Sequence, residues 1–153
     1  MSRYMFNAQD GLRFLRPKYF YVGAMYDGTE DQLPRFVSEG IWENGHQNGV
    51  KKYNLRYCSI QKGDVLLVKR MLGKGKSEMR ILAIGIVVGK DPHDAWRLRV
   101  EWSIPELAVK TPFHEPSTIS AAQDNIPNPL MKYADKARGI FLRANLNIQQ
   151  TFY

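Results

Sequence analysis

The sequence is short of the residues that build disulfides, metal sites and membrane spans. Cys58 is the one cysteine in 153 residues, so an intrachain disulfide and a cysteine-rich metal site are excluded. The three histidines stand in separate predicted loops without the spacing of metal ligands. No apolar run approaches the roughly 18 residues of a transmembrane helix, and the N-terminal segment lacks the apolar stretch of a signal peptide. We therefore expect a cytoplasmic protein with no metal or other cofactor and no membrane partner.

Catalytic motifs are lacking as well. No Ser-His-Asp or Cys-His arrangement stands out, and Cys58 lies in a segment where we expect it to be buried. The run Gly73–Ser77 resembles a phosphate-binding loop, but Arg70 stands where that motif needs a glycine, and two strands flank the run. Glu43 with His46 is the one acid–base pair in a predicted turn. The sequence therefore predicts a binding protein and not an enzyme.

Acidic residues are few in comparison with basic residues. The chain has 22 Lys and Arg against 15 Asp and Glu, a formal charge of +7. The segment from Lys51 to Arg99 alone holds twelve basic and four acidic residues, with Tyr and Trp among them. A basic, aromatic strip of this kind is typical of a surface for phosphates and stacked bases. The alternative is a solvated sheet face that binds nothing.

The pattern of apolar residues predicts an α+β domain. Strands are expected at 19–24, 65–70, 81–88 and 96–102, and helices from Leu33 to a stop at Gly40 and from about Pro129 to Arg143. Gly85 inside an apolar strand indicates a bulge or a close backbone approach. Together these elements predict a strongly curved sheet or small barrel of five or six strands with two or three helices. We expect the domain to span 18–145, between an N-terminal extension, 1–17, and a C-terminal tail, 146–153.

Two tryptophans suggest a binding pocket. Trp42 follows the stop of the first predicted helix, in what reads as a polar loop, and Trp96 stands at the mouth of a predicted strand. Two indoles that flank one cavity can hold a flipped base between their π faces. The alternative is that Trp42 closes the end of the barrel as a core residue.

The segments Tyr19–Val22, Gly40–Gly45 and Lys51–Leu55 resemble the opening of YTH and EVE domains of the PUA-like superfamily. The stretch Gly-Ile-Trp-Glu-Asn-Gly is most similar to EVE-like modules at the N-termini of bacterial AAA+ restriction ATPases of the modified-cytosine (Mcr) type. The segments 61–66, 84–87 and 97–102 extend the resemblance, which covers about residues 18 to 128.

This resemblance implies a small PUA-like barrel whose aromatic cage holds a modified, flipped base. The base is N6-methyladenine in YTH proteins and often a modified cytosine or adenine in EVE-like modules. By position, Trp42 matches the first cage tryptophan and Trp96 lies near the second. Gly23–Met25 replaces the polar Lys-Ser-Asn of YTH readers. The other implied contacts to the base are Tyr26, Asp27 and Asn44.

The implied partner is DNA or RNA that carries a modified base, with an ATPase or nuclease subunit on a separate chain and a role in defence against modified foreign DNA. An RNA-binding domain without modification selectivity is one alternative. An enzyme that uses Glu43 or Asp27 on a nucleotide or a small amide is another, and a protein-interaction subunit is a third. The expected phosphate contacts are Lys51, Lys52, Lys69, Arg70, Lys74, Lys76 and Arg97.

Overall fold

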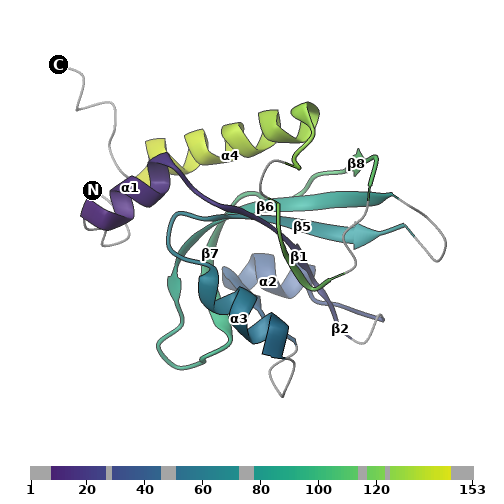
Figure 1. The fold of residues 1–153 in the computed structure, drawn as a ribbon, viewed down its shortest axis with the longest axis horizontal. Helices are drawn as coiled ribbons and strands as arrows, with labels where there is room; N and C mark the ends of the chain where they lie inside the picture. Colours follow the sequence, from purple (N-terminus) through teal and green to yellow (C-terminus); the bar gives the residue numbers. More distant parts are fainter. Residues whose placement is uncertain are drawn as a thin grey trace.

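The chain forms an α+β fold in which a curled sheet carries helices on both faces (Figure 1). The computed structural model describes residues 8–26, 29–45, 51–72, 78–113, 117–122 and 125–145, and for 8–11 and 51–54 it describes the backbone alone. The helices are α1 (Ala8–Leu15), α2 (Leu33–Glu39), α3 (Lys51–Ser59) and α4 (Asn128–Asn145). The strands are β1 (Tyr19–Gly23), β2 (Met25–Tyr26), β3 (Glu30–Asp31), β4 (Ile41–Glu43), β5 (Val65–Met71), β6 (Met79–Lys90), β7 (Arg97–Ile104), β8 (Val109–Thr111) and β9 (Ile119–Ala121).

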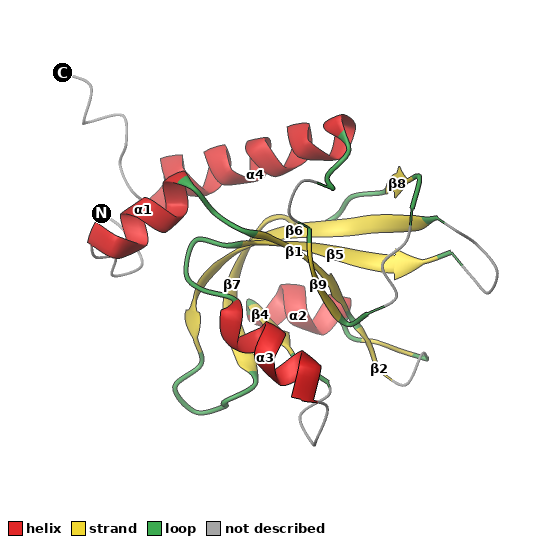
Figure 2. Cartoon of the chain, in the orientation of Figure 1, coloured by secondary structure: helices red, strands yellow, loops and turns green. Residues whose placement is uncertain are grey.

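Six strands follow one another across the main sheet in the order β4–β7–β6–β5–β1–β9, and β8 pairs with β6 beside this path. β1 runs parallel to β5, whereas the other strand pairs are antiparallel. The register shifts between Val68 and Lys69 in β5 and at two places between β6 and β7. Such shifts bend a strand and increase its twist. The sheet therefore curls into a half-barrel (Figure 2).

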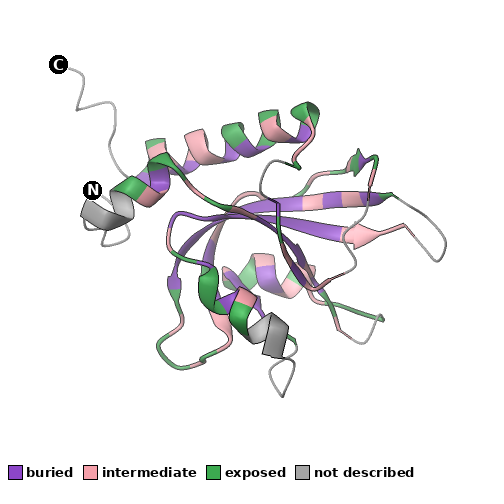
Figure 3. Ribbon diagram, in the orientation of Figure 1, coloured by how far each residue is buried: buried purple, intermediate pink, exposed green. Residues whose placement is uncertain are grey.

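Both faces of the sheet are covered, which explains the continuous apolar runs in β5 and β6 (Figure 3). Leu66 and Val68 of β5 point into a core that also contains residues of α2, β4 and α3, here called the α3-side core. Val65 and Leu67 point the opposite way, into a core shared with α1 and α4, here called the α4-side core. Each core anchors a different set of helices on the same sheet.

Most of the predicted elements are present. The strands expected at 65–70 and 81–88 correspond to β5 and β6, and the last predicted helix corresponds to α4. The helix expected from Leu33 begins there and ends at Gly40, whose φ of 68° is left-handed. The α+β class and the curved sheet of six strands are therefore confirmed.

Three expectations from the sequence are wrong. Trp42 is not in a loop, because it is the middle residue of β4 and pairs with Leu98 of β7. Residues 51–59 form helix α3 and the N-terminal segment contains α1, so the described part of the chain has four helices instead of two or three. Cys58 is exposed instead of buried, since α3 directs the neighbouring Tyr57 to the core.

Helix α1 packs onto the fold although it lies in the predicted extension, 1–17. The ring of Phe14 stacks on Phe141 of α4, with their centroids 5.3 Å apart. Arg13 forms two hydrogen bonds to the buried carboxylate of Asp64. α1 is therefore tied both to α4 and to the turn before β5. The predicted tail, 146–153, lies outside the described residues.

Gly85 allows a close approach between β6 and β7. The pairing of β6 with β7 shifts register between Ile84 and Ile86, on either side of this glycine. A Cβ atom at Gly85 would overlap Cγ1 of Val100 and lie 2.8 Å from Cε3 of Trp102. The predicted irregularity and close approach at Gly85 are confirmed, and a side chain at this position has no room.

We predict that Gly85→Ala lowers the free energy of unfolding by about 1–3 kcal/mol, because Val100 must move to admit a methyl group. The matched control is Gly139→Ala in α4, where the nearest atom is the mobile Nη1 of Arg143 at 3.2 Å. Helix propensity should make this variant more stable by about 0.5–1 kcal/mol. Urea unfolding measures both changes. Equal stability of Gly85→Ala and the parent would contradict the close approach.

Candidate functional site

Three aromatic rings from separate elements meet at one end of the α3-side core and are here called the aromatic stack. They are Trp42 of β4, Tyr57 of α3 and Trp96 of the turn before β7. The Tyr57 ring lies 6.5 Å from Trp42 at an interplanar angle of 23°, and 5.5 Å from Trp96 at 59°. The stack brings together the two tryptophans that the sequence suggested, with a tyrosine that contacts both.

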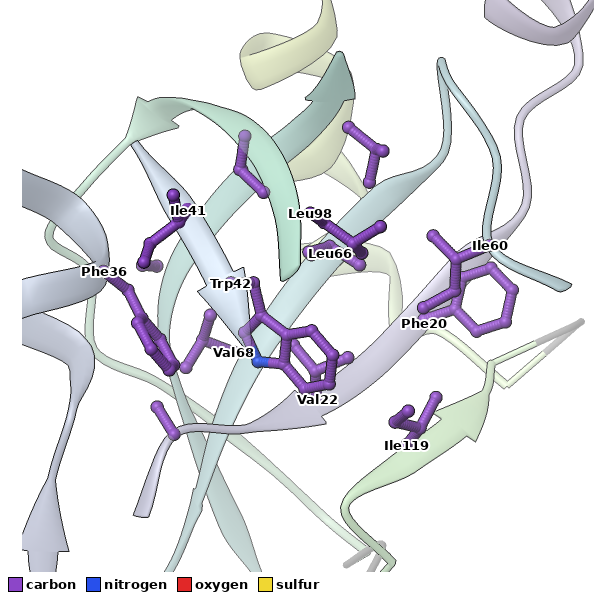
Figure 4. Packing of buried hydrophobic residues seen from close by; sticks show 14 of the residues in the cluster. Phe20, Val22, Phe36, Ile41, Trp42, Ile60, Leu66, Val68, Leu98 and Ile119 are labelled. Carbon is purple, nitrogen blue, oxygen red and sulfur yellow. The ribbon is translucent and has the colours of Figure 1, made fainter. Parts of the chain in front are cut away.

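Trp42 is the inner wall of the stack. Its side chain is fully buried, and its indole N–H donates a hydrogen bond of 2.9 Å to the carbonyl oxygen of Gly23 at the end of β1. Figure 4 shows the indole among Phe36, Val22 and Val68 in the α3-side core. Trp42 is therefore a core residue with a fixed ring, and a ligand can reach it only if a neighbour moves.

Tyr57 is the neighbour that covers Trp42. It is 1% exposed, and its hydroxyl has no hydrogen-bond partner among the described residues. Burial raises the pKa of this hydroxyl, so it stays neutral. A buried hydroxyl without a partner costs about 1–3 kcal/mol. The ammonium of Lys90 lies 5.3 Å from the centroid of the Tyr57 ring, where a cation gains from the π face.

Trp96 is the outer wall and lies only partly buried against the α3-side core. Its backbone N–H donates to the Asp94 carboxylate at 2.9 Å, which shapes the turn before β7. Its carbonyl accepts a hydrogen bond of 2.9 Å from the backbone N–H of Asn44, which directly follows β4. These bonds hold the turn with Trp96 beside the strand that carries Trp42.

A buried carboxylate lies beside Trp42 in β4. Glu43 accepts hydrogen bonds from Tyr26 at 2.9 Å, from Arg97 Nε at 2.8 Å and from the guanidinium of Arg35. The bond from Arg35, with help from Tyr26 and Arg97, lowers the pKa of Glu43 to about 2 despite its burial. Glu43 therefore stays ionised and saturated with donors, which does not suit a general acid or base at neutral pH. Its suggested acid–base partner, His46, lies outside the described residues.

The other suggested base contacts are placed only in part. The ring of Tyr26 meets Phe36 edge to face, and its hydroxyl is used by Glu43. Asn44 is buried next to the aromatic stack, whereas Asp27 lies outside the described residues. Contact of these residues with a base stays a prediction.

The suggested phosphate contacts are scattered over the fold. Lys69 is buried, Arg70 pairs with Asp31 at 2.6 Å, and Arg97 is held by Glu43. The backbone of Lys51 and Lys52 opens α3, and Lys74 and Lys76 lie outside the described residues. The three described side chains are thus engaged within the fold, and phosphate binding by this set stays a prediction.

Two residues at the aromatic stack are absent from the site predicted from the sequence: Tyr57, which belongs to the stack, and Lys90, whose ammonium lies over the Tyr57 ring. Tyr53, Tyr57 and Ile60 recur at the i, i+4, i+7 spacing of a helix face. That spacing was the signal for α3 and for a buried Tyr57. Nothing in the sequence could have placed Lys90 over the tyrosine ring, because the contact joins α3 to the far end of β6.

The described part of the chain contains no group of three or more His, Cys, Asp or Glu that could hold a metal ion. None of its helices is both long enough and apolar enough to cross a membrane.

Comparison with known proteins gives one similar structure to report. No protein-family model matches the sequence, and no curated protein is significantly similar to it. The YTH domain of the Zygosaccharomyces rouxii MRB1 protein, solved in complex with N6-methyladenosine RNA, is similar at 16% identity and a TM-score of 0.44. The similarity covers 80% of this chain and 87% of that one. A likeness of this degree assigns neither a fold nor a ligand, so function must be inferred from the residues of this chain.

We predict that Glu43→Gln lowers the free energy of unfolding at neutral pH by about 1–3 kcal/mol, because the buried donors lose a charged acceptor. The pKa of Glu43 is about 2 in the folded protein against an ordinary 4.5. Its ionic contribution is therefore present above pH 4.5 and is lost as the pH falls towards 2. Denaturant unfolding between pH 7 and pH 2 should show the gap between parent and variant closing over that window.

Glu39→Gln is the matched control, because Glu39 pairs with the same Arg35 at 3.4 Å on the exposed surface of α2. Its effect should stay within about 0.5 kcal/mol. A gap for Glu43→Gln that does not change with pH would show that its carboxylate is not the ionised centre of this cluster.

Proposed function

We propose that this protein is a nucleic-acid reader that takes a modified, flipped nucleobase into the aromatic stack, in the place held here by Tyr57. The observation that carries the proposal is the position of the Tyr57 ring, in contact with both Trp42 and Trp96. A space that accepts one flat aromatic ring beside two indoles also suits the ring of a base. Tyr57 therefore acts as a stand-in for the base when no nucleic acid is bound.

In the closed form, seen here, the Tyr57 ring fills the aromatic stack, and in the loaded form a base takes its place. Two energy terms favour the loaded form. Stacking of a base on an aromatic side chain contributes about 1–3 kcal/mol. The closed form carries the buried hydroxyl of Tyr57 without a partner in the described part of the chain, at a cost of about 1–3 kcal/mol. Outward movement of Tyr57 returns that hydroxyl to water while a base fills the space. Both terms offset part of the cost of moving the buried Tyr57 ring out of the α3-side core.

The two tryptophans have different roles in this exchange. Trp42 is held by Gly23 and by the core, so it provides a rigid inner wall. Trp96 is partly buried at the edge of the core and provides the outer wall on the side of entry. A methyl group on the base adds apolar area, and burial of one such group is worth about 0.8 kcal/mol, or about fourfold in affinity. Selectivity for a methylated base follows from that gain.

The resemblance of Gly40–Gly45 to EVE-like modules of Mcr-type restriction ATPases supports a finer assignment. The base would be N6-methyladenine or a modified cytosine, with Asp27 and Asn44 near its polar edge. An ATPase or nuclease on a separate chain would act on the bound strand, in defence against modified foreign DNA.

A second candidate function is nucleic-acid binding without selectivity for a modified base. The observation in its favour is the complete burial of Trp42, whose ring is already satisfied within the core. In this case the base stacks only on the accessible side of Trp96, and a modification changes the affinity little.

We predict that Trp96→Ala abolishes the preference for a modified oligonucleotide and weakens its binding by about 1–3 kcal/mol, because the outer wall is lost. The test is a binding titration at fixed salt. Its ligands are matched strands that carry N6-methyladenine, 5-methylcytosine, 5-hydroxymethylcytosine or no modification.

Tyr133→Ala controls for the loss of an aromatic ring, since Tyr133 is exposed on α4, away from the stack. Trp42→Ala is less informative, because removal of a fully buried tryptophan costs about 3–5 kcal/mol in stability. Equal affinity of the parent for modified and unmodified strands would reject the reader and favour the second candidate.

We predict opposite effects of Tyr57→Phe on stability and on binding. Loss of the hydroxyl removes an unpartnered buried group, so the free energy of unfolding should rise by about 1 kcal/mol. The closed form becomes more stable by that amount, so opening for a base costs more and affinity for the modified strand should fall. The fall is about fivefold if the whole stabilisation opposes binding. Urea unfolding and the same titration measure the two effects. Tighter binding by Tyr57→Phe would contradict a closing role for Tyr57.

A further inference from the structure

A basic groove lies between α1, the end of α3 and the end of β6. It consists of two adjoining hollows of about 460 Å³ and 560 Å³ that share Arg13 and Gln61 as lining residues. Lys62 and Lys90 line one hollow, and Arg16 lines the other. In Figure 1 the segment that connects α3 to β5 runs between α3 and α1. None of the phosphate contacts that the sequence suggested is among the described residues that line this basic groove.

The floor of the basic groove is rigid. Asp64 is fully buried and accepts hydrogen bonds from Arg13 and from the backbone N–H groups of Lys18 and Gln61. Gly63, with φ of 92°, brings the turn so close to α1 that a Cβ atom would lie 3.1 Å from the backbone nitrogen of Phe14. The positions of Arg13 and Gln61 are therefore set before any ligand binds.

The charge of the basic groove is of one sign. Among the described residues that line its two hollows there is no Asp or Glu. Asp64 lies beneath the floor and is matched by Arg13, and the nearby Asp91 contacts Arg97 at 3.5 Å. The aliphatic part of the Lys62 side chain lies beside Gly89, the residue before Lys90. Its Cε is 3.9 Å from the position that a Cβ atom at Gly89 would occupy. The groove thus concentrates cations that favour a polyanion.

Apolar surface lies beside these cations. Leu12 and Leu15 of α1 line the same hollow as Arg16 and are 69% and 72% exposed. A simple inorganic anion gains no binding energy from apolar surface, whereas a nucleotide chain offers both phosphates and flat apolar faces. At the other end, Lys90 lies over Tyr57 and so joins the groove to the aromatic stack.

We propose that the basic groove binds the sugar–phosphate backbone of the single strand whose base enters the aromatic stack, with Arg16, Lys62 and Lys90 at the phosphates. The proposal rests on the proposed function for the identity of that strand. Binding in the groove itself does not depend on a modified base. Cys58 lines the groove, is exposed and is the only thiol of the chain. The rate at which its thiol reacts therefore shows whether the groove is occupied.

The first test follows alkylation of Cys58 by iodoacetamide, measured by mass spectrometry. The probes are an unmodified single-stranded RNA of about ten nucleotides and the DNA of the same sequence. A saturating strand should slow the reaction by about tenfold at low salt, and the protection should fade as salt displaces the phosphates. An unchanged rate of alkylation with a strand shown to be bound by anisotropy would overturn the proposal.

The second test compares two double charge reversals of equal net charge. Lys62→Glu with Lys90→Glu should weaken binding of the unmodified strand by at least about tenfold and reduce the slope of log affinity against log salt by about 1.4. Lys132→Glu with Lys136→Glu, on the exposed face of α4, is the control and should change both far less. Equal losses in the two variants would overturn the proposal, since binding would then follow net charge alone.

Free methylated nucleosides separate this proposal from the proposed function, because they lack phosphates and need only the aromatic stack. Nucleoside binding that depends on Trp96, without protection of Cys58 by any strand, would leave the reader and remove the groove. Protection of Cys58 without any preference for methylated nucleosides would retain the groove and remove the reader.

Discussion

The arrangement of the site depends on the hydrogen bonds and ion pairs made by the buried carboxylate of Glu43. It stands next to Trp42 in β4, opposite Arg97 of β7 in the strand register, and it accepts bonds from Tyr26 and from Arg35 of α2. One ionised group therefore ties together two sheet strands, the short β2 and a helix. A buried charge is tolerated only with such partners, and removal of all of them would leave a costly unpaired group. The same bonds keep both ends of the aromatic stack in place.

The aromatic stack combines the demands of a core and of a binding site. Trp42 is buried and hydrogen-bonded like a core residue, whereas Tyr57 is buried with a hydroxyl that no described residue partners. Protein interiors rarely leave such groups without a partner, so this hydroxyl needs an explanation, and the proposed exchange of the Tyr57 ring for a base supplies one. On the side of β4 the stack is held by the hydrogen bond of Trp42, whereas on the side of α3 the Tyr57 hydroxyl has no partner among the described residues. This asymmetry is why α3, and not the sheet, is the element we expect to move.

Charge in this chain has two distinct uses, which its net value of +7 does not reveal. Arg35, Arg70 and Arg97 are paired with carboxylates and belong to the fold. Arg16, Lys62 and Lys90 line two hollows with no described acid in their walls, while Arg13, which also lines them, is paired with Asp64 beneath the floor. Affinity for a polyanion would therefore come from the second group, and the structural ion pairs would contribute little to it.

The sequence by itself determined the α+β class, the main strands and helix α2 with its stop at Gly40, because apolar periodicity and glycine conformation are local properties. It also suggested that Trp42 and Trp96 flank one cavity, and in the structure each of them contacts the ring of Tyr57. It did not reveal β4, since three residues carry too little pattern for a strand, and it did not reveal α3, whose one signal is the spacing of Tyr53, Tyr57 and Ile60. Only the tertiary structure decided that Tyr57 lies between the tryptophans, that Arg97 serves Glu43, and that Lys62 and Lys90 share a groove with Arg16. Each of these contacts joins segments far apart in the chain, and their meeting depends on sheet register and strand curvature, which no local pattern encodes.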